Sequence, residues 1–62
     1  MIAAYSQVIL TEAIPNTNLK QGDLGTVVEV YNNGEGYEIG FFDSNGNTIV
    51  VETLRAAQIR EV

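Results

Sequence analysis

The amino-acid sequence predicts an all-β protein, a small antiparallel barrel of five short strands with one short helical turn before the last strand. The chain has 62 residues, 45% of them hydrophobic, which suffices for one small core and not for two. We therefore expect a single domain over residues 1–62. Runs of β-branched and aromatic residues alternate with runs rich in Gly and Asn, as in strands joined by tight turns.

Strand propensity and turn residues predict the first half of the barrel. Residues 6–10 (SQVIL) are strand-like and run into residues 11–14, before Pro15 ends any regular element. Residues 15–23 are polar apart from Leu19, and we expect a long ordered loop in which Leu19 packs back against the barrel. Residues 25–31 are nearly all β-favouring, and residues 32–36 contain the Asn and Gly of a hairpin turn.

The third predicted strand, residues 37–42, has two different faces. Successive side chains of a strand point to opposite sides of the sheet. We expect the core-facing set to be Tyr37, Ile39 and Phe41, and the opposite set to be Glu38, Gly40 and Phe42.

A second hairpin leads into the rest of the chain. Asn45 and Gly46 form a strong hairpin signal, because both residues accept the positive φ of a type I′ turn. Residues 47–53 predict the fourth strand, residues 54–59 a single helical turn, and residues 60–62 a last short strand. This order of strands and turns fits an SH3-like topology.

Alternation and hydropathy also predict the buried residues. The expected core is Val8, Leu10, Leu19, Val28, Val30, Ile39, Phe41, Val51, Leu54 and Ile59. We expect Gly22, Gly25 and Gly40 where the backbone takes a positive φ, bulges or lets another strand come close.

The residue types that the chain lacks exclude most catalytic and metal chemistry. The chain has no Cys and no His, which excludes disulfides, zinc sites built on sulfur or imidazole, a Cys nucleophile and a Ser-His-Asp triad. We expect no enzymatic activity, no cofactor and no metal. No segment has the length of a membrane span or the features of a signal peptide, and this predicts a cytoplasmic protein without a membrane partner.

The charge balance is strongly acidic. Eight Asp and Glu residues stand against three Lys and Arg residues, which gives a net charge of -5. This balance argues against a nucleic-acid partner, because binding to phosphates needs clustered Lys and Arg. It favours either simple solubility or a basic protein partner.

Two local motifs have a structural interpretation that competes with ligand binding. Residues 43–47 (DSNGN) begin like a calcium loop, but Thr48 and Leu54 stand where that motif needs Gly and Glu. A plain hairpin turn is therefore the preferred interpretation. Asp23 follows Gly22, and its carboxylate can accept backbone N–H groups of the turn.

The outward side chains of the second and third strands form the candidate binding face. Aromatic side chains bordered by acidic ones are typical of a protein-binding surface. The alternative is that the loop or the C-terminal turn covers this face. The candidate partner-binding residues are Val27, Glu29, Tyr31, Glu38 and Phe42.

Residues 19–31 (LKQGDLGTVVEVY) and 37–43 (YEIGFFD) resemble a family of short bacterial proteins of about 60 residues that is known only as a domain of unknown function. Its pattern L-K-x-G-D-x-G-T-V-V-x-V-Y is matched here, as are the Gly46 turn, Thr53-Leu54 and a late Arg60. The chain departs from the pattern at Gly40, where Glu is commoner, and at Phe42. The resemblance covers nearly the whole chain.

The resemblance implies an SH3-like barrel in a free-standing cytoplasmic protein without known catalysis. Some members of the family look like small partners of neighbouring toxin-like or nuclease-like genes, which implies an antitoxin or immunity role. The segment GDLGTVV, residues 22–28, also looks like the glycine-led strand of KOW-type barrels that bind RNA or protein.

The leading hypothesis is a non-enzymatic protein-interaction module, an antitoxin, an immunity-type protein or an accessory partner. It would bind a basic, toxin-like protein through the acidic and aromatic face. One alternative is a KOW-like nucleic-acid-binding barrel. Another is a structural subunit that joins an assembly by strand addition, which includes a homodimer formed through an edge strand.

Overall fold

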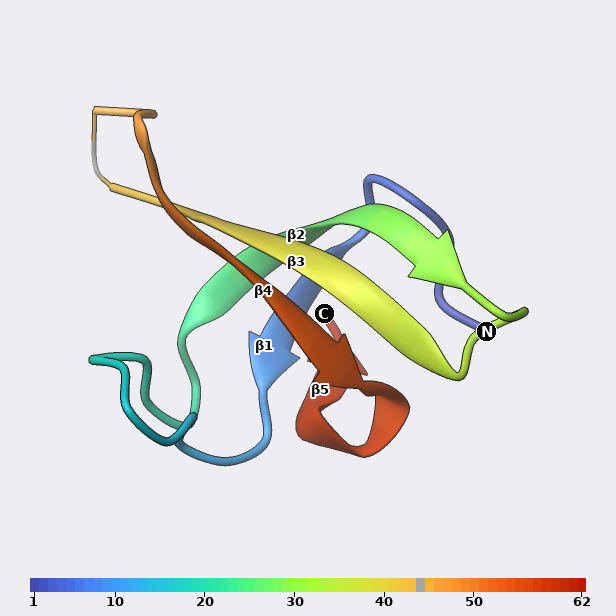
Figure 1. Ribbon diagram of the computed structural model, residues 1–62. Coiled ribbons are helices and arrows are strands. Elements are labelled where there is room, and N and C mark those ends of the chain that lie inside the picture. The colour runs from blue at the N-terminus through green and yellow to red at the C-terminus, as the bar shows by residue number, and fades with distance from the viewer. Residues whose placement is uncertain (44) are drawn as a thin grey trace.

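The computed structural model describes residues 1–43 and 45–62, which form strands and one short 3₁₀ turn (Figure 1). Within these residues, five strands make one antiparallel sheet in the order β4-β3-β2-β1-β5. The elements are β1 (Gln7–Leu10), β2 (Leu24–Tyr31), β3 (Gly36–Phe42), β4 (Thr48–Arg55), η1 (Ala56–Gln58) and β5 (Ile59–Glu61). The predicted all-β class, with a helical turn before the last strand, is confirmed.

The strand bounds agree with the prediction to within two residues. The largest difference is at the end of β4, which continues through two residues that the sequence assigned to the helical turn. Leu54 pairs with Tyr37 and Arg55 pairs with Gly36, so β4 stays in the sheet as far as β3 provides a partner. After η1, the chain returns to the first strand, where Ile59 pairs with Leu10.

The buried apolar side chains come from all the strands and from the loop that joins β1 to β2. They are Val8, Leu10, Ile14, Val27, Tyr37, Ile39, Phe41, Leu54 and Ile59. The predictions for Val8, Leu10, Ile39, Phe41, Leu54 and Ile59 are confirmed, and Leu19 and Val30 are partly buried against this core. The predictions for Val28 and Val51 are wrong, because these side chains are 36% and 47% exposed.

A β-bulge in β2 explains the error at Val28. Val27 pairs with Ile39 while Glu29 pairs with Glu38, so Val28 is an extra residue without a partner on β3. A bulge of this kind interrupts the alternation of side chains between the two faces. Val27 is therefore fully buried, and Val28 lies on the outer surface, the reverse of the prediction for both residues.

The error at Val51 has a similar origin in β4. Val50 pairs with the buried Phe41, and Val51 pairs with Gly40 on the opposite side of β3. Two adjacent valines fit either phase of alternation. The phase is set by the β3–β4 turn and by the register shift between Phe41 and Phe42.

The β3–β4 turn is not the predicted type I′ turn centred on Asn45 and Gly46. The Gly46 N–H donates to the Asp43 carbonyl at 3.0 Å, and the Asp43 N–H donates to the Asn47 carbonyl at 2.9 Å. The hydrogen-bonded turn thus begins at Asp43 and has Gly46, with φ 83°, as its fourth residue. A turn followed by a left-handed residue is the usual three-residue hairpin connection; Ser44 itself lies outside the described residues.

Gly25 lies where β2 passes over the core. A Cβ atom at this position would be 2.6 Å from Cγ2 of Ile39 and 2.9 Å from Cε1 of Phe41. Only glycine leaves room for these two side chains, so the predicted close approach at Gly25 is confirmed.

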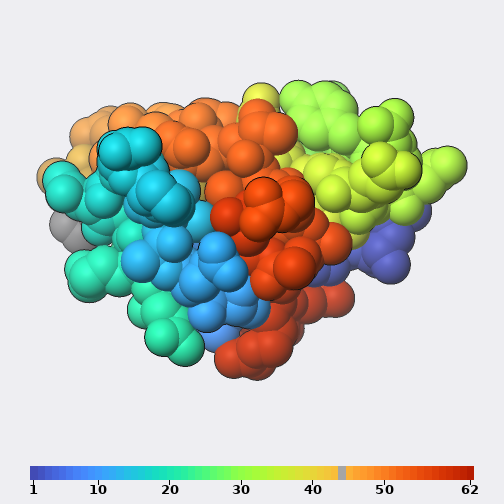
Figure 2. All heavy atoms as spheres, turned by 60° about the horizontal axis from the view of Figure 1, so that its bottom comes forward, coloured from blue at the N-terminus to red at the C-terminus, as the bar shows by residue number. Residues whose placement is uncertain are grey.

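The loop of residues 11–23 is ordered by its own hydrogen bonds. Thr17 Oγ1 donates to the Ile14 carbonyl at 2.8 Å and accepts the Leu19 N–H at 3.0 Å. The Ile14 N–H donates to the Leu19 carbonyl. The loop consequently holds both apolar side chains against the core, as predicted for Leu19, and its cyan atoms lie at the left end of the molecule in Figure 2.

Candidate protein-binding face

The outer face of the sheet is the surface of β2, β3 and β4 that points away from the core. Glu38 on β3 lies opposite Glu29 on β2 and Thr53 on β4. Gly40 lies opposite Val51 on β4. Residues that are directly opposite in an antiparallel pair share a face, and Glu38 and Gly40 alternate along β3 with its core residues Tyr37, Ile39 and Phe41. All five residues therefore belong to the outer face.

Glu38 is the centre of a hydrogen-bonded group on this face, which we call the acidic half. The Tyr31 hydroxyl donates to Glu38 Oε2 at 3.2 Å, and the Thr53 hydroxyl donates to Glu38 Oε1. The residues of the acidic half are Glu29, Tyr31, Glu38 and Thr53. The two hydroxyl groups hold the Glu38 carboxylate in a fixed orientation across three neighbouring strands.

The acidic half also changes the ionisation of Tyr31. Partial loss of hydration raises the pKa of the Tyr31 hydroxyl, and the negative charge of Glu38, its hydrogen bond and the charge of Glu29 raise it further. Tyr31 therefore stays protonated and remains a hydrogen-bond donor to Glu38.

The other end of the outer face is apolar. Phe42 Cζ and Val28 Cγ1 would lie 3.2 Å and 3.5 Å from a Cβ atom at Gly40, so these two side chains extend over the glycine. Ile49 and Val51 on β4 are also exposed, Ile49 at 63%. We call Val28, Phe42, Ile49 and Val51 the apolar half of the outer face.

The structure brings four of the five sequence-predicted site residues to this face. Glu29, Tyr31 and Glu38 lie in the acidic half and Phe42 in the apolar half. Tyr31 and Phe42 are 40% and 44% exposed, so neither the loop nor the C-terminal turn covers them fully. Val27 is a correction, because the bulge turns its side chain into the core.

Sequence reasoning misses four residues of the face. It places Val28 and Val51 in the core and does not include Ile49 or Thr53 in the candidate face. The glycine at position 40 was the available signal, since a residue without a side chain on an outward position leaves space that a neighbouring aromatic ring can cover. The cross-strand bond from Thr53 to Glu38 depends on the register of β3 against β4, which the sequence does not define.

In the described residues, the two local motifs, residues 43–47 and Asp23, form hydrogen bonds that stabilise turns. Asp43 Oδ1 accepts the N–H groups of Asn45 and Asn47 at 2.9 Å and 3.0 Å, as a turn-capping carboxylate does. Asp23 Oδ2 accepts the Lys20 N–H at 2.9 Å, and its own N–H donates to the Lys20 carbonyl. The structural interpretation of Asp23 is thereby confirmed.

In residues 1–43 and 45–62, no pocket is present and no group of three or more acidic side chains is placed to hold a metal ion. None of the helical segments in this part of the chain has the length and apolar character needed to cross a membrane.

Comparison with known proteins identifies a family but no activity. A family model described as "Domain of unknown function (DUF4926)" matches residues 4–61. No curated protein and no solved structure matches the chain.

Proposed function

The chain belongs to this family of unknown function, and we propose that it is a non-enzymatic interaction module that binds a basic protein through its outer face. The observation that carries the proposal is the juxtaposition of the acidic half and the exposed apolar half on neighbouring strands. Exposed apolar patches with a polar border are common at protein-binding sites.

The two halves would have different roles in binding. Aromatic and aliphatic side chains at the centre of an interface contribute most of its energy, and Phe42 with Val28 is placed for this over Gly40. Carboxylates at the border attract a basic partner and orient it. Glu38 is held by two hydroxyl groups, so a Lys or Arg of the partner would meet an oriented carboxylate.

Several finer features belong to the same proposal. The strand order and the 3₁₀ turn before β5 support an SH3-like barrel. We place the protein in the bacterial cytoplasm as a small antitoxin, immunity-type protein or accessory partner of a basic toxin-like protein. The net charge of -5 supports such a partner and argues against a KOW-like nucleic-acid function.

The experiment that tests the proposal is capture of the tagged protein from its host with Glu29→Lys and Glu61→Lys variants. Both reverse one charge, but Glu29 is on the outer face and Glu61 is on β5 at the other edge of the sheet. We expect Glu29→Lys to lose the captured protein and Glu61→Lys to retain it.

The two variants distinguish binding through the outer face from binding that depends only on the net negative charge of the protein. Equal capture by both variants contradicts the acidic face, and a captured species that disappears after nuclease treatment supports the nucleic-acid alternative. Circular dichroism of each variant verifies that the sheet has formed.

A further inference from the structure

β4 is an open edge of the sheet. Among the described strands only β3 pairs with β4, and outside that pairing no backbone-to-backbone hydrogen bond of the described chain involves residues 48–54. β4 has 8 residues, whereas β5, at the opposite edge, has 3. A long open edge is a template on which another polypeptide can pair.

The backbone groups that face away from β3 can be assigned. The Arg55 N–H donates to Oε1 of Gln58 at 2.8 Å, so it points away from β3. Pairing with β3 is regular from Val50 to Arg55, and in antiparallel pairing the residues whose N–H and C=O groups face the partner alternate along the strand. Val51 and Thr53 therefore also direct these groups outward from the edge.

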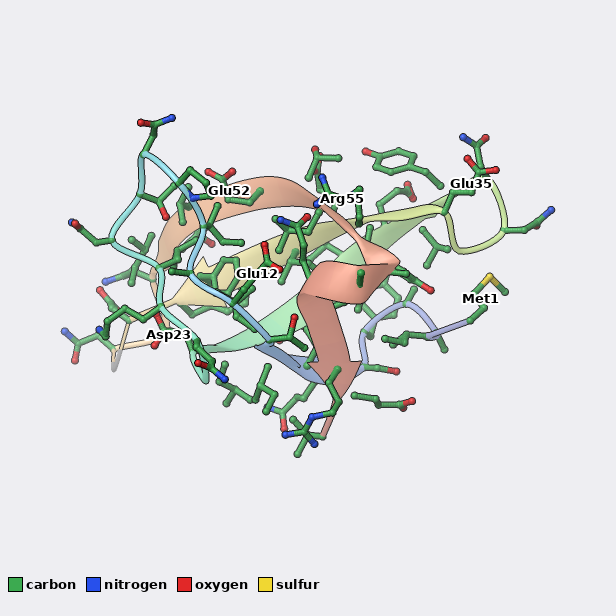
Figure 3. The ribbon with its side chains drawn as sticks, turned by 90° about the horizontal axis from the view of Figure 1, so that it is seen from below. Met1, Glu12, Asp23, Glu35, Glu52 and Arg55 are labelled. Atoms are coloured by element: carbon green, nitrogen blue, oxygen red, sulfur yellow. The ribbon has the colours of Figure 1, made fainter. Side chains whose placement is uncertain are left out.

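The side chains on either side of the edge define the chemistry of an added strand. Ile49 and Val51 are exposed on the outer side. Glu52 lies opposite the buried Ile39, so it is on the inner side, where it is half-buried; Figure 3 shows it on the part of β4 beside the 11–23 loop. An added strand alternates its side chains in the same way, and one set would contact Val51 while the other would meet the Glu52 carboxylate.

Charge argues against a second copy of this chain as the added strand. Symmetric antiparallel pairing of two β4 strands centred on Glu52 places the two Glu52 carboxylates directly opposite, and pairing centred on Val51 places them diagonally. Each chain also carries a net charge of -5. An inward-pointing charge on an edge strand opposes self-pairing, but the same charge attracts a strand with Lys or Arg.

We infer that β4 accepts a β-strand from a basic polypeptide in which apolar residues alternate with Lys or Arg. The apolar residues extend the apolar half of the outer face, and the cations lie on the side of Glu52. The inference rests on the proposed function, because the strand belongs to the basic partner, and it names the backbone edge that holds this partner.

The probe is a short blocked peptide of alternating Val and Lys, matched in length to β4, with an alternating Val and Glu peptide as its control. Binding to the intact protein is followed by NMR, which reports the protection of each backbone amide. We expect the Val-Lys peptide to bind and to protect the Val51 and Thr53 amides, and the Val-Glu peptide not to bind. Glu52→Gln should weaken binding up to about fivefold, and Glu61→Gln should leave it unchanged.

A proline on β4 tests whether backbone pairing is used. Val51→Pro removes an N–H that faces away from β3, a position where an edge strand tolerates proline, and Val51→Ala removes a similar side chain but keeps the N–H. We expect Val51→Pro to bind the peptide about tenfold more weakly than Val51→Ala. Should Val51→Pro not fold, two peptides replace it as the test, each N-methylated on one of the two alternating sets of its residues. We expect only one of these two peptides to lose binding.

Each contrary result has a distinct meaning. Equal binding of the peptide by Val51→Pro and Val51→Ala overturns strand addition, and so do chemical-shift changes confined to the outer face. Either result leaves the proposed function standing. Binding of the Val-Glu peptide, or pairing of the protein with itself through β4, overturns the choice of a basic strand. Absence of any binding overturns the inference, whereas the proposed function is judged by capture with Glu29→Lys.

Discussion

The inner and outer faces of β3 are formed by alternate residues of one strand, and they differ in burial and in polarity. On the inner face, Tyr37, Ile39 and Phe41 are buried, and the polar end of Tyr37 is satisfied by the Ile2 N–H at 3.0 Å. On the outer face, Glu38 is hydrogen-bonded and Phe42 is exposed. The inner face thus determines stability, and the outer face is available for binding.

This difference implies that stability and binding can be changed separately by substituting neighbouring residues. The adjacent residues Phe41 and Phe42 allow a direct comparison of substitutions on the two faces, because they have the same side chain and lie on opposite sides of the sheet.

The largest expected effect is that of Phe41→Ala. Removal of the buried ring leaves a cavity and should lower the free energy of unfolding by about 3–5 kcal/mol, which approaches the whole stability of so small a domain. Urea denaturation followed by circular dichroism measures this loss, and Phe41→Leu is the milder control. A Phe41→Ala protein as stable as the original would mean that the inner face has been misassigned.

A smaller effect on stability is expected for Phe42→Ala. The ring is exposed and covers Gly40, so its removal should lower the free energy of unfolding by less than about 1 kcal/mol. Affinity for the captured partner should nevertheless fall by about tenfold or more, as for an interface anchor. Calorimetric titration gives the affinity, and the two faces would not be separable if Phe42→Ala lost as much stability as Phe41→Ala.

The smallest effect concerns the ionisation of Tyr31. Its pKa is raised by lost hydration and by Glu38, so the difference in ultraviolet titration between the protein and Tyr31→Phe should show a phenol that ionises above the usual range. Because the pKa is raised in the folded state, the associated stabilisation is present at lower pH and is lost as pH rises through that pKa.

The Glu38→Gln variant provides the control for this titration. Loss of the carboxylate charge should lower the pKa of Tyr31. An unchanged titration would show that Glu38 does not act on Tyr31 in solution.

The sequence predicted most of the fold because strands and turns have strong local signals. The alternation of Tyr37, Ile39 and Phe41 predicted the inner face correctly, and the turn-rich segments separated the strands to within two residues. A single domain over the whole chain stays a prediction.

The errors arose where pairing between strands decides which way a side chain points. The bulge at Val28 and the register shift near Phe42 each change the phase of alternation, and local propensity carries no information about them. These two shifts explain why Val27 was placed on the binding face and why Val28 and Val51 were placed in the core.

The central claim is that the outer face, together with the β4 edge, binds a basic partner while the inner face holds the fold. The most direct test is an NMR map of the isotope-labelled protein as the captured partner is added. We predict chemical-shift changes at Glu29, Tyr31, Glu38 and Phe42. We also predict protection of the Val51 and Thr53 amides from exchange. Shifts confined to the 11–23 loop and β5, with the outer face unchanged, would contradict the claim.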